Sequence, residues 1–178
     1  MLKRIVGVLA ACMVLFAIPQ SASAMVIPNH FSRMLIGANW KCLDADTNTM
    51  NTNGGIVQQW QCIGNPADNT TPNNQLWLAV PQNNGSAAYS LVPGGTTGFK
   101  CLTTIGGLSY SRVGLWDCNS GTSQAWFPIN TNAWVNPATG LCLEADPNQN
   151  YNGGGMYIAP CATADGKPVL RQTFGFID

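Results

Sequence analysis

The sequence predicts an all-β fold with threefold internal symmetry. A Gln-x-aromatic triplet occurs three times, as Gln75-Leu76-Trp77, Gln124-Ala125-Trp126 and Gln172-Thr173-Phe174, at spacings of 49 and then 48 residues. Beyond the first two dozen residues, no long segment places apolar residues at helical spacing. Short apolar runs alternate instead with Gly, Pro and Asn, as in sandwiches and barrels. Units of this size cannot each bury a core alone, so we expect them to close around a shared axis.

Residues 1–24 are predicted to be a cleaved secretory signal peptide that lies outside the fold. Lys3 and Arg4 are followed by an apolar run from Ile5 to Ile18 and by the small-residue cleavage signal Ala22-Ser23-Ala24. The run is short for a membrane span, and a retained anchor is the alternative. We therefore expect a secreted, extracellular protein whose mature chain begins near Met25 and forms one domain over residues 25–178.

Charge excludes some classes of partner. Signal cleavage removes two of the eight basic residues, which leaves six against eight acidic ones and a net charge of about −2. This balance argues against nucleic acid or an anionic membrane as a partner. Only 9% of residues are charged, so the surface is expected to carry mostly neutral hydrogen-bonding groups.

Six of the seven cysteines remain after cleavage and predict a disulfide framework. They fall into successive pairs, Cys42 with Cys62, Cys101 with Cys118 and Cys142 with Cys161, separated by 20, 17 and 19 positions. Six cysteines allow 15 connectivities, but the repetition favours the one in which each repeat closes on itself. Each such loop stabilises the fold by about 3 kcal/mol. A zinc site would need close pairs such as C-x2-C, which do not occur here, so no metal or other cofactor is expected.

The first repeat contains the fullest set of motifs. It has Lys41-Cys42-Leu43-Asp44, then Val57-Gln58-Gln59-Trp60-Gln61-Cys62, then Asn74-Gln75-Leu76-Trp77. Short apolar segments at 34–36, 89–92 and 133–135 precede the three cysteine pairs and are expected to be strands. These landmarks give repeats of about 33–80, 81–130 and 131–178.

This order of motifs resembles the ricin B-type lectins, in which three Gln-x-Trp repeats form a β-trefoil. The resemblance covers the chain from about Arg33 to Ile177. It implies twelve strands, arranged as a six-stranded barrel capped by three hairpins. It also implies that Trp77, Trp126 and Phe174 are buried, which agrees with the packing role expected of aromatic residues that recur once in each unit.

The resemblance further implies a carbohydrate site in the first repeat. There Asp44 would accept hydrogen bonds from two neighbouring sugar hydroxyls, and Trp60 would stack on the apolar C–H face of the ring. The amides of Gln58, Asn74 and Gln75 would fix the orientation of the sugar. A pyranose has an apolar face and a polar rim, so this combination suits it. The alternative is that Asp44 and the amides only tie down turns and that Trp60 belongs to the core.

The other two repeats have lost most of these groups. Repeat two has Thr103, Gly114 and Ser123 in place of the acid, the glutamine and the asparagine, and keeps only Trp116 as a stacking residue. Repeat three has Glu144, Tyr157 and Arg171 at those positions, and Ala159 in place of the stacking residue. We therefore expect a single site. At about 0.3 kcal/mol per atom, one monosaccharide would bind only near millimolar, so multivalency, a longer glycan or a partner is needed.

An enzyme is the less favoured class. The only histidine, His30, precedes the first repeat, and Asp44 and Glu144 stand at equivalent positions of different repeats, too far apart to flank one bond. The sequence thus predicts a non-enzymatic lectin for a galactose-type or related glycan. The alternatives are a cell-binding subunit that works with a partner toxin or enzyme subunit, and a protein-binding inhibitor that acts through the loop from Asn65 to Asn73.

Overall fold

The computed structural model describes residues 27–83, 86–129, 132–164 and 167–177. The predicted signal peptide, residues 1–24, lies outside these ranges. Within them, no helix has the length and apolar character that crossing a membrane would require.

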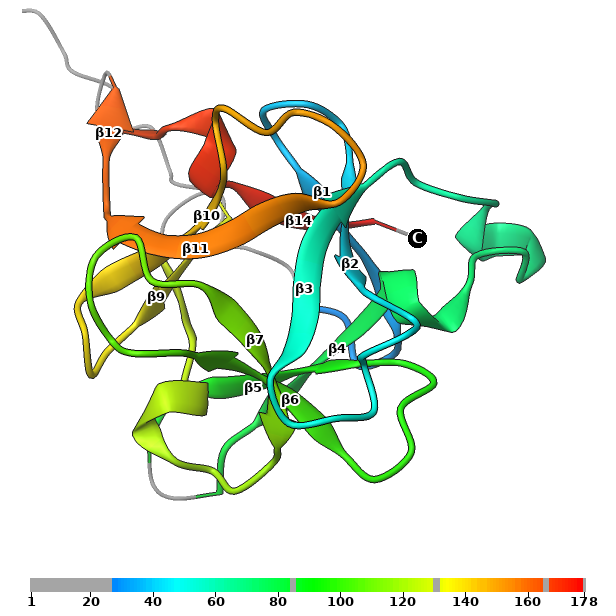
Figure 1. The fold of residues 1–178 in the computed structure, drawn as a ribbon, viewed down its shortest axis with the longest axis horizontal. Helices are drawn as coiled ribbons and strands as arrows, with labels where there is room; N and C mark the ends of the chain where they lie inside the picture. Colours follow the sequence, from blue (N-terminus) through cyan, green and yellow to red (C-terminus); the bar gives the residue numbers. More distant parts are fainter. Residues whose placement is uncertain (1–26, 84–85, 130–131, 165–166, 178) are drawn as a thin grey trace, which may run out of the picture.

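Twelve strands form one sheet, and two short strands form a separate hairpin (Figure 1). The first group of four comprises β1 (Ser32–Ile36), β2 (Cys42–Ala45), β3 (Gly55–Trp60) and β4 (Leu76–Pro81). The second comprises β5 (Tyr89–Pro93), β6 (Lys100–Thr104), β7 (Val113–Asp117) and β8 (Phe127–Ile129). The third comprises β9 (Ala133–Asn136), β10 (Leu141–Ala145), β11 (Gly154–Pro160) and β14 (Phe174–Ile177). The extra hairpin is β12 (Thr163–Ala164) with β13 (Lys167–Pro168), and the 3-10 helices are η1 (Pro66–Asp68), η2 (Asn73–Gln75), η3 (Thr122–Gln124) and η4 (Leu170–Gln172).

The first and last strands of the three groups form a barrel. β1 pairs with β14 and β4, β4 pairs with β5, and β8 pairs with β9, all antiparallel. A bridge between Tyr89 and Trp126 joins β5 to the start of β8, and the Phe174 N–H donates to the Asn132 carbonyl at 2.7 Å on the remaining side. These contacts close the ring of strands between the groups.

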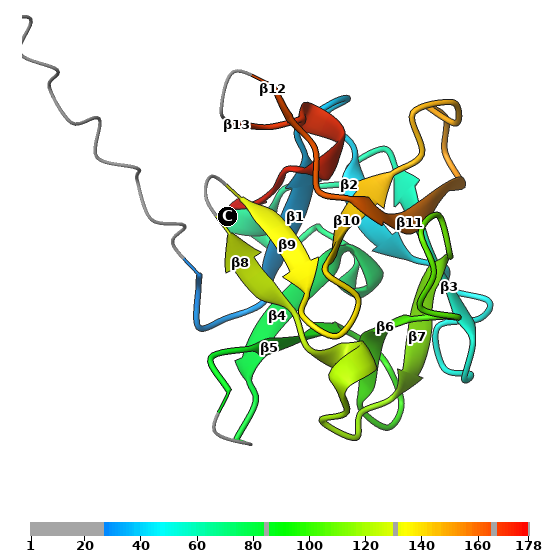
Figure 2. The same cartoon turned by 90° about the vertical axis from the view of Figure 1, so that its left-hand side faces the viewer.

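The middle strands form three hairpins that cap the barrel. They are β2–β3, β6–β7 and β10–β11. β3 pairs with both β7 and β11, and the Arg112–Tyr157 bridge joins β7 to β11 (Figures 1 and 2). The predicted β-trefoil of twelve strands is therefore confirmed. The hairpin β12–β13 is an addition that the sequence did not predict, because it lies between the second cysteine and the Gln-x-aromatic triplet, where the repeats share no motif.

The aromatic residues of the triplets form the centre of the core. Trp77, Trp126 and Phe174 are fully buried, as predicted. The indole N–H of Trp77 donates to the Leu43 carbonyl at 2.8 Å, and that of Trp126 donates to the Leu102 carbonyl at 2.9 Å. Each tryptophan thus ties a barrel strand to the hairpin above it. The three predicted disulfides are also present, with Cα–Cα distances of 5.1, 5.1 and 5.0 Å.

The glutamine of each triplet joins three segments of its own repeat. Its amide nitrogen donates to the polar residue of the Cys-Leu-polar motif and to the backbone carbonyl before the second cysteine, and its amide oxygen accepts from the N–H after that cysteine. The distances are 3.0, 3.0 and 2.9 Å for Gln75, 3.1, 2.9 and 2.9 Å for Gln124, and 2.6, 2.9 and 2.8 Å for Gln172. A side chain must both donate and accept to make this set, which a carboxylate cannot do.

We predict that Gln124→Ala destabilises the fold by about 2–4 kcal/mol, because several buried backbone and side-chain groups lose their partner at once. Chemical denaturation with the disulfides intact measures the change. The matched control is Thr122→Ala in the same 3-10 helix, where the side chain is exposed and the change should stay within about 0.5 kcal/mol. Equal stability of the two variants would contradict the structural role given to the glutamine.

Candidate functional site

Strand pairing brings three of the predicted site residues onto one face of the first hairpin. Asp44 lies opposite Gln58, and Cys42 lies opposite Trp60. Because side chains alternate along a strand, Gln58 and Trp60 point to the same side as Asp44. The 3-10 helix η2 follows Pro72 and places Asn74 and Gln75 against this face.

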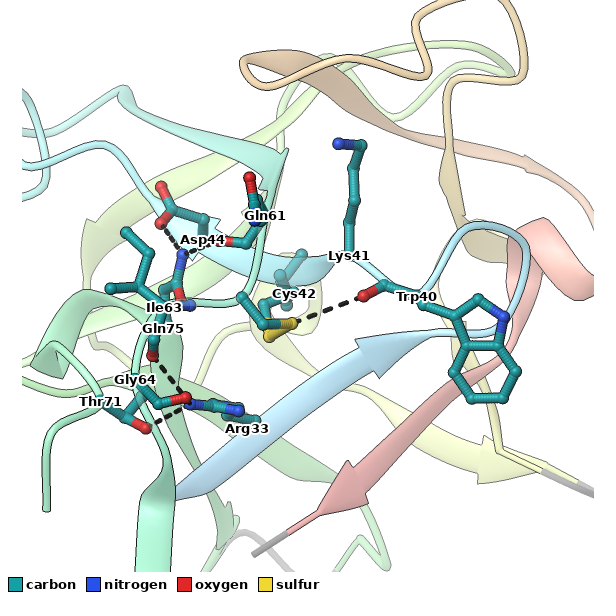
Figure 3. The surroundings of a disulfide bond; sticks show 12 residues. Arg33, Trp40, Lys41, Cys42, Asp44, Gln61, Ile63, Gly64, Thr71 and Gln75 are labelled. Atoms are coloured by element: carbon teal, nitrogen blue, oxygen red, sulfur yellow. Dashed lines mark hydrogen bonds between the residues drawn. A yellow bond between two sulfur atoms is a disulfide. The ribbon is translucent and has the colours of Figure 1, made fainter. Parts of the chain in front are cut away.

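Four of the five predicted residues meet at the carboxylate of Asp44. Its Oδ1 accepts from the amide of Gln58 at 2.9 Å, and its Oδ2 accepts from the amides of Asn74 at 2.9 Å and Gln75 at 3.0 Å. Figure 3 shows the last of these contacts beside the first disulfide. Asn74 also donates to the Ala45 carbonyl at 3.0 Å, which ties η2 to the end of β2.

This arrangement limits what Asp44 can still bind. A carboxylate offers about four acceptor positions, and three are used within the protein. The side chain is also buried, with 3% exposure. One acceptor position on Oδ1 is left, so two sugar hydroxyls can bind together only if one amide moves away.

Burial raises the pKa of Asp44 above its ordinary value, because it penalises the charged form. The hydrogen bonds from Gln58, Gln75 and Asn74 act in the opposite direction, and the nearby charge of Asp46 adds to the increase. Asp44 therefore takes up a proton at a higher pH than a solvent-exposed aspartate does.

Trp60 lies at the end of β3 and is partly exposed, so the structure does not place it in the barrel core. Its ring borders Gly153, which belongs to the loop between β10 and β11 in the third repeat. A Cβ at Gly153 would lie 3.9 Å from the Trp60 ring and 3.7 Å from the amide oxygen of Gln58. The first repeat's site thus has a wall from repeat three, which the sequence analysis did not foresee.

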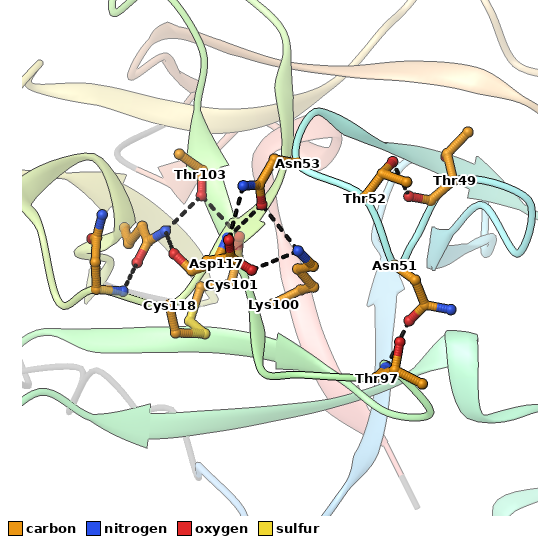
Figure 4. A network of polar contacts seen from close by, with 12 residues as sticks. Thr49, Asn51, Thr52, Asn53, Thr97, Lys100, Cys101, Thr103, Asp117 and Cys118 are labelled. Atoms are coloured by element: carbon orange, nitrogen blue, oxygen red, sulfur yellow. Dashed lines mark hydrogen bonds and ion pairs between the residues drawn. A yellow bond between two sulfur atoms is a disulfide. The ribbon is translucent and has the colours of Figure 1, made fainter.

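Asn152, next to this glycine, holds the loop of repeat three against repeat one by two hydrogen bonds. Its side-chain oxygen accepts from the Lys41 ammonium at 3.1 Å and from the backbone N–H of Gln61 at 2.8 Å. The same contact recurs one repeat further on, where the Asn53 oxygen accepts from the Lys100 ammonium at 3.0 Å and from the Asp117 N–H at 2.9 Å (Figure 4). The sequence feature that marks this contact is an Asn-x-Asn-Gly-Gly pattern, which occurs in both loops as Asn51-Thr52-Asn53-Gly54-Gly55 and Asn150-Tyr151-Asn152-Gly153-Gly154.

A cavity of about 290 Å³ lies at the equivalent position in repeat two. Thr103 replaces the acid there; its hydroxyl donates to the Cys101 carbonyl at 2.8 Å and accepts from Gln124 at 3.1 Å. Trp116, 42% exposed, lines the cavity together with Ser123. The cavity of repeat two therefore keeps an aromatic wall and hydroxyl groups, but no carboxylate lines it.

Repeat three has a cavity of about 220 Å³ with a different lining. Glu144 accepts from Gln172 at 2.6 Å and forms an ion pair with Arg171 at 3.1 Å, so its charge is neutralised within the repeat. Tyr157 lines this cavity with Tyr110 of repeat two, and the guanidinium of Arg112 lies 5.9 Å from the centre of its ring.

The largest cavity described, about 670 Å³, lies elsewhere. It is bordered by the turn after β1, by the loop after β10 and by η4 with the hairpin before it, and its walls are mostly apolar. None of the five predicted site residues lines it.

The loop named for the inhibitor alternative is tied to the barrel by Arg33. One nitrogen of its guanidinium donates to the carbonyls of Ile63 and Gly64 and to the Thr71 hydroxyl (Figure 3). Asn65 also caps η1 by accepting from the Ala67 N–H.

We predict that Asp44→Asn keeps the fold within about 1 kcal/mol of the wild-type stability, whereas Asp44→Ala costs about 2–4 kcal/mol. The asparagine oxygen can still accept from Asn74 and Gln75, and the Gln58 amide can turn over to offer its oxygen to the new nitrogen. Alanine would remove one acceptor from each of three amides, and the Gln58 amide has no other acceptor among the contacts described above. Denaturant unfolding separates the two variants, and an equal loss would show that the charge itself holds the cluster together.

Comparison with known proteins agrees with this fold. The family model described as the ricin-type beta-trefoil lectin domain matches residues 32–167. A designed threefold-symmetric protein, ThreeFoil, has a TM-score of 0.67 at 18% identity and covers 83% of this chain and 98% of its own. The agglutinin from Abrus precatorius has a TM-score of 0.60 at 22% identity, over 86% of this chain and 51% of its own. The C-half of the earthworm R-type lectin, solved with GalNAc, has a TM-score of 0.59 at 14% identity, over 84% of this chain and 98% of its own.

This chain thus spans about half the length of the Abrus agglutinin chain and nearly all of the other two. A search of curated proteins gave no match. At these identities the solved structures show only the fold, whereas the match to the family model shows the family. The chain belongs to the ricin-type β-trefoil lectin domain family.

Proposed function

We propose that this protein is a secreted, non-catalytic lectin that binds one sugar residue at its first repeat through Asp44, Gln58, Trp60, Asn74 and Gln75. The observation that carries the proposal is the cluster of three amides on the Asp44 carboxylate beside the partly exposed Trp60. Membership of a lectin family supports carbohydrate as the ligand class. The cavity of repeat two has no carboxylate, and the carboxylate of repeat three is paired with Arg171 and has no tryptophan beside it.

In the proposed complex, the sugar lies with its C–H face on Trp60 and one hydroxyl directed at the open position of Asp44. The amide nitrogens of Gln58 and Asn74 are committed to Asp44, which leaves their oxygens to accept from further hydroxyls. Stacking and a charge-assisted hydrogen bond together are the interactions that a pyranose needs.

The ligand that we propose is a galactose-type sugar at the end of a longer or repeated glycan. The earthworm lectin domain named above was solved with GalNAc, which supports this sugar class by family resemblance. A single shallow site binds weakly, so a useful interaction needs many copies of the sugar. A cell-binding subunit that delivers a partner toxin or enzyme uses the same site and is the second candidate, favoured by the fact that a mosquitocidal holotoxin contains a domain of this fold over 17% of its chain.

We predict that Trp60→Ala and Asp44→Asn each lower binding to a multivalent galactose surface at least tenfold, since each removes one half of the site. Surface plasmon resonance on the mature chain measures the change, with thermal unfolding as a check on folding. The control is Trp116→Ala, the equivalent residue of repeat two, which should change binding less than twofold.

A loss of binding in Trp116→Ala would contradict the single site. Unchanged binding in both repeat-one variants would exclude that site. If the wild-type chain binds no glycan at any density, a protein partner becomes the better interpretation, and the loop from Asn65 to Asn73 should be tested first.

We also predict that binding weakens as the pH falls and that the loss begins above the range expected of an exposed aspartate. The folded-state pKa of Asp44 is raised by burial, and its protonation replaces an acceptor by a donor at the position where a sugar hydroxyl binds. Binding should therefore be complete above this pKa and be lost below it. Titration of binding between about pH 7 and 4 measures the effect; the residual binding of Asp44→Asn should show no such transition.

A further inference from the structure

Two lysines at equivalent positions of the first two repeats have different electrostatic environments. Each lies directly before the first cysteine of its repeat. Each also donates to an asparagine in the hairpin loop of another repeat, Lys41 to Asn152 of repeat three and Lys100 to Asn53 of repeat one. The Lys100 ammonium also forms an ion pair with Asp117 at 2.6 Å, and this contact lowers the pKa of Asp117. In repeat one the residue at the place of Asp117 is the neutral Gln61. Among the described residues, no carboxylate forms an ion pair with Lys41.

Asn152 holds the Lys41 ammonium at the Trp60 end of the site. Lys41 directly precedes β2 and stands three residues before Asp44, so in extended chain the two side chains leave the backbone in opposite directions. The hydrogen bond to Asn152 draws the ammonium to the edge of β3 that faces β11. There the Asn152 side-chain oxygen accepts from the Lys41 ammonium at 3.1 Å and from the backbone N–H of Gln61, the residue after Trp60, at 2.8 Å. Asn152 also directly precedes Gly153, which borders the Trp60 ring. Figure 3 shows Lys41 extending past Gln61.

Asp44 and Asp46, the carboxylates nearest to Lys41 along the chain, do not cancel this positive charge. Asp44 is buried under three amides and lies three residues along the strand, or about 10 Å in extended chain. Asp46 is five residues away, or about 16 Å. At physiological ionic strength the screening length is about 8 Å. The two ends of the site therefore differ: the Asp44 end requires a hydroxyl donor, and the Trp60 end presents a cation.

We propose that Lys41, positioned by Asn152 of the third repeat, makes the first-repeat site selective for an acidic sugar, with a carboxylate or sulfate on the side of the ring away from Asp44. This inference rests on the proposed lectin function and deepens it. An acidic substituent would replace the carboxylate that Asp117 supplies to the equivalent lysine in repeat two.

The test uses three multivalent ligands that share the galactose configuration: a neutral α-1,4-linked digalactose, the corresponding digalacturonate, and 6-O-sulfated galactose. The variants are Lys41→Met, which removes the charge and the hydrogen bond to Asn152 but keeps an unbranched side chain, Lys41→Arg, which restores the charge, and Asn152→Ala, which frees the lysine. The matched controls are Lys100→Met and Asn53→Ala, which remove the same contacts one repeat away. Thermal unfolding of all five variants monitors the fold.

The wild-type chain should bind at least one acidic ligand about five- to tenfold more tightly than the neutral one, which corresponds to about 1–1.4 kcal/mol. Lys41→Met should abolish this preference and leave neutral binding within twofold, and Lys41→Arg should retain most of it. Asn152→Ala should reduce the preference, whereas both controls keep it. Added salt should weaken acidic binding and leave neutral binding unchanged.

Equal binding of neutral and acidic ligands by the wild-type chain, or a parallel loss of both in Lys41→Met, would overturn the inference while the lectin function stands. If none of the three ligands binds the wild-type chain at any density, the proposed function itself fails, and the inference fails with it. A preference for the sulfated ligand alone or for the uronate alone supports the inference and identifies the anion.

Discussion

The fold depends most on one side-chain amide in each repeat, that of the glutamine before the buried aromatic residue. Gln75, Gln124 and Gln172 each hold the start of a hairpin, its return strand and the segment after the second cysteine in one set of hydrogen bonds. The neighbouring disulfide joins the same segments covalently. Because the glutamine and the disulfide fix the hairpin relative to the barrel, the other polar residues can differ between repeats as long as one of them accepts from the glutamine amide.

The partner that this glutamine meets at the Cys-Leu-polar motif differs in every repeat. It is a carboxylate with two further amides in repeat one, a hydroxyl in repeat two and a carboxylate paired with an arginine in repeat three. All three satisfy the glutamine, so the scaffold tolerates the exchange. The candidate site is thus an elaboration of a structural hydrogen bond, and under the proposed function Asp44 serves both purposes. Its structural role explains why three acceptor positions of its carboxylate are occupied by amides of the protein itself.

The sequence predicted the architecture well because the features that determine it recur. Three triplets, three cysteine pairs and short apolar runs specified the repeat, the disulfides and the buried aromatic residues. The grouping of Asp44, Gln58, Asn74 and Gln75 was likewise predicted and is present. What could not be predicted is a contact between repeats. The wall supplied by Asn152 and Gly153 lies more than 90 residues from Trp60 in the chain, and only ring closure brings it there.

Ring closure also gives each site a neighbour that is not its own repeat. The hairpin loop of repeat three lies against repeat one, and that of repeat one lies against repeat two, each through an asparagine that accepts from a lysine and from a backbone N–H. The third junction cannot copy this contact. Leu141 replaces the lysine, and Pro160 has no N–H to donate. The bridge from Arg112 to Tyr157 is the strand pairing that the other two junctions also have, in β3–β7 and β3–β11. The charge at each site is therefore set at the junction: Asp117 neutralises the lysine of repeat two, whereas Gln61 leaves that of repeat one available. Under the proposed selectivity, a change of one residue beside the second cysteine alters which ligand a site attracts, without any change to the residues proposed to hold the sugar.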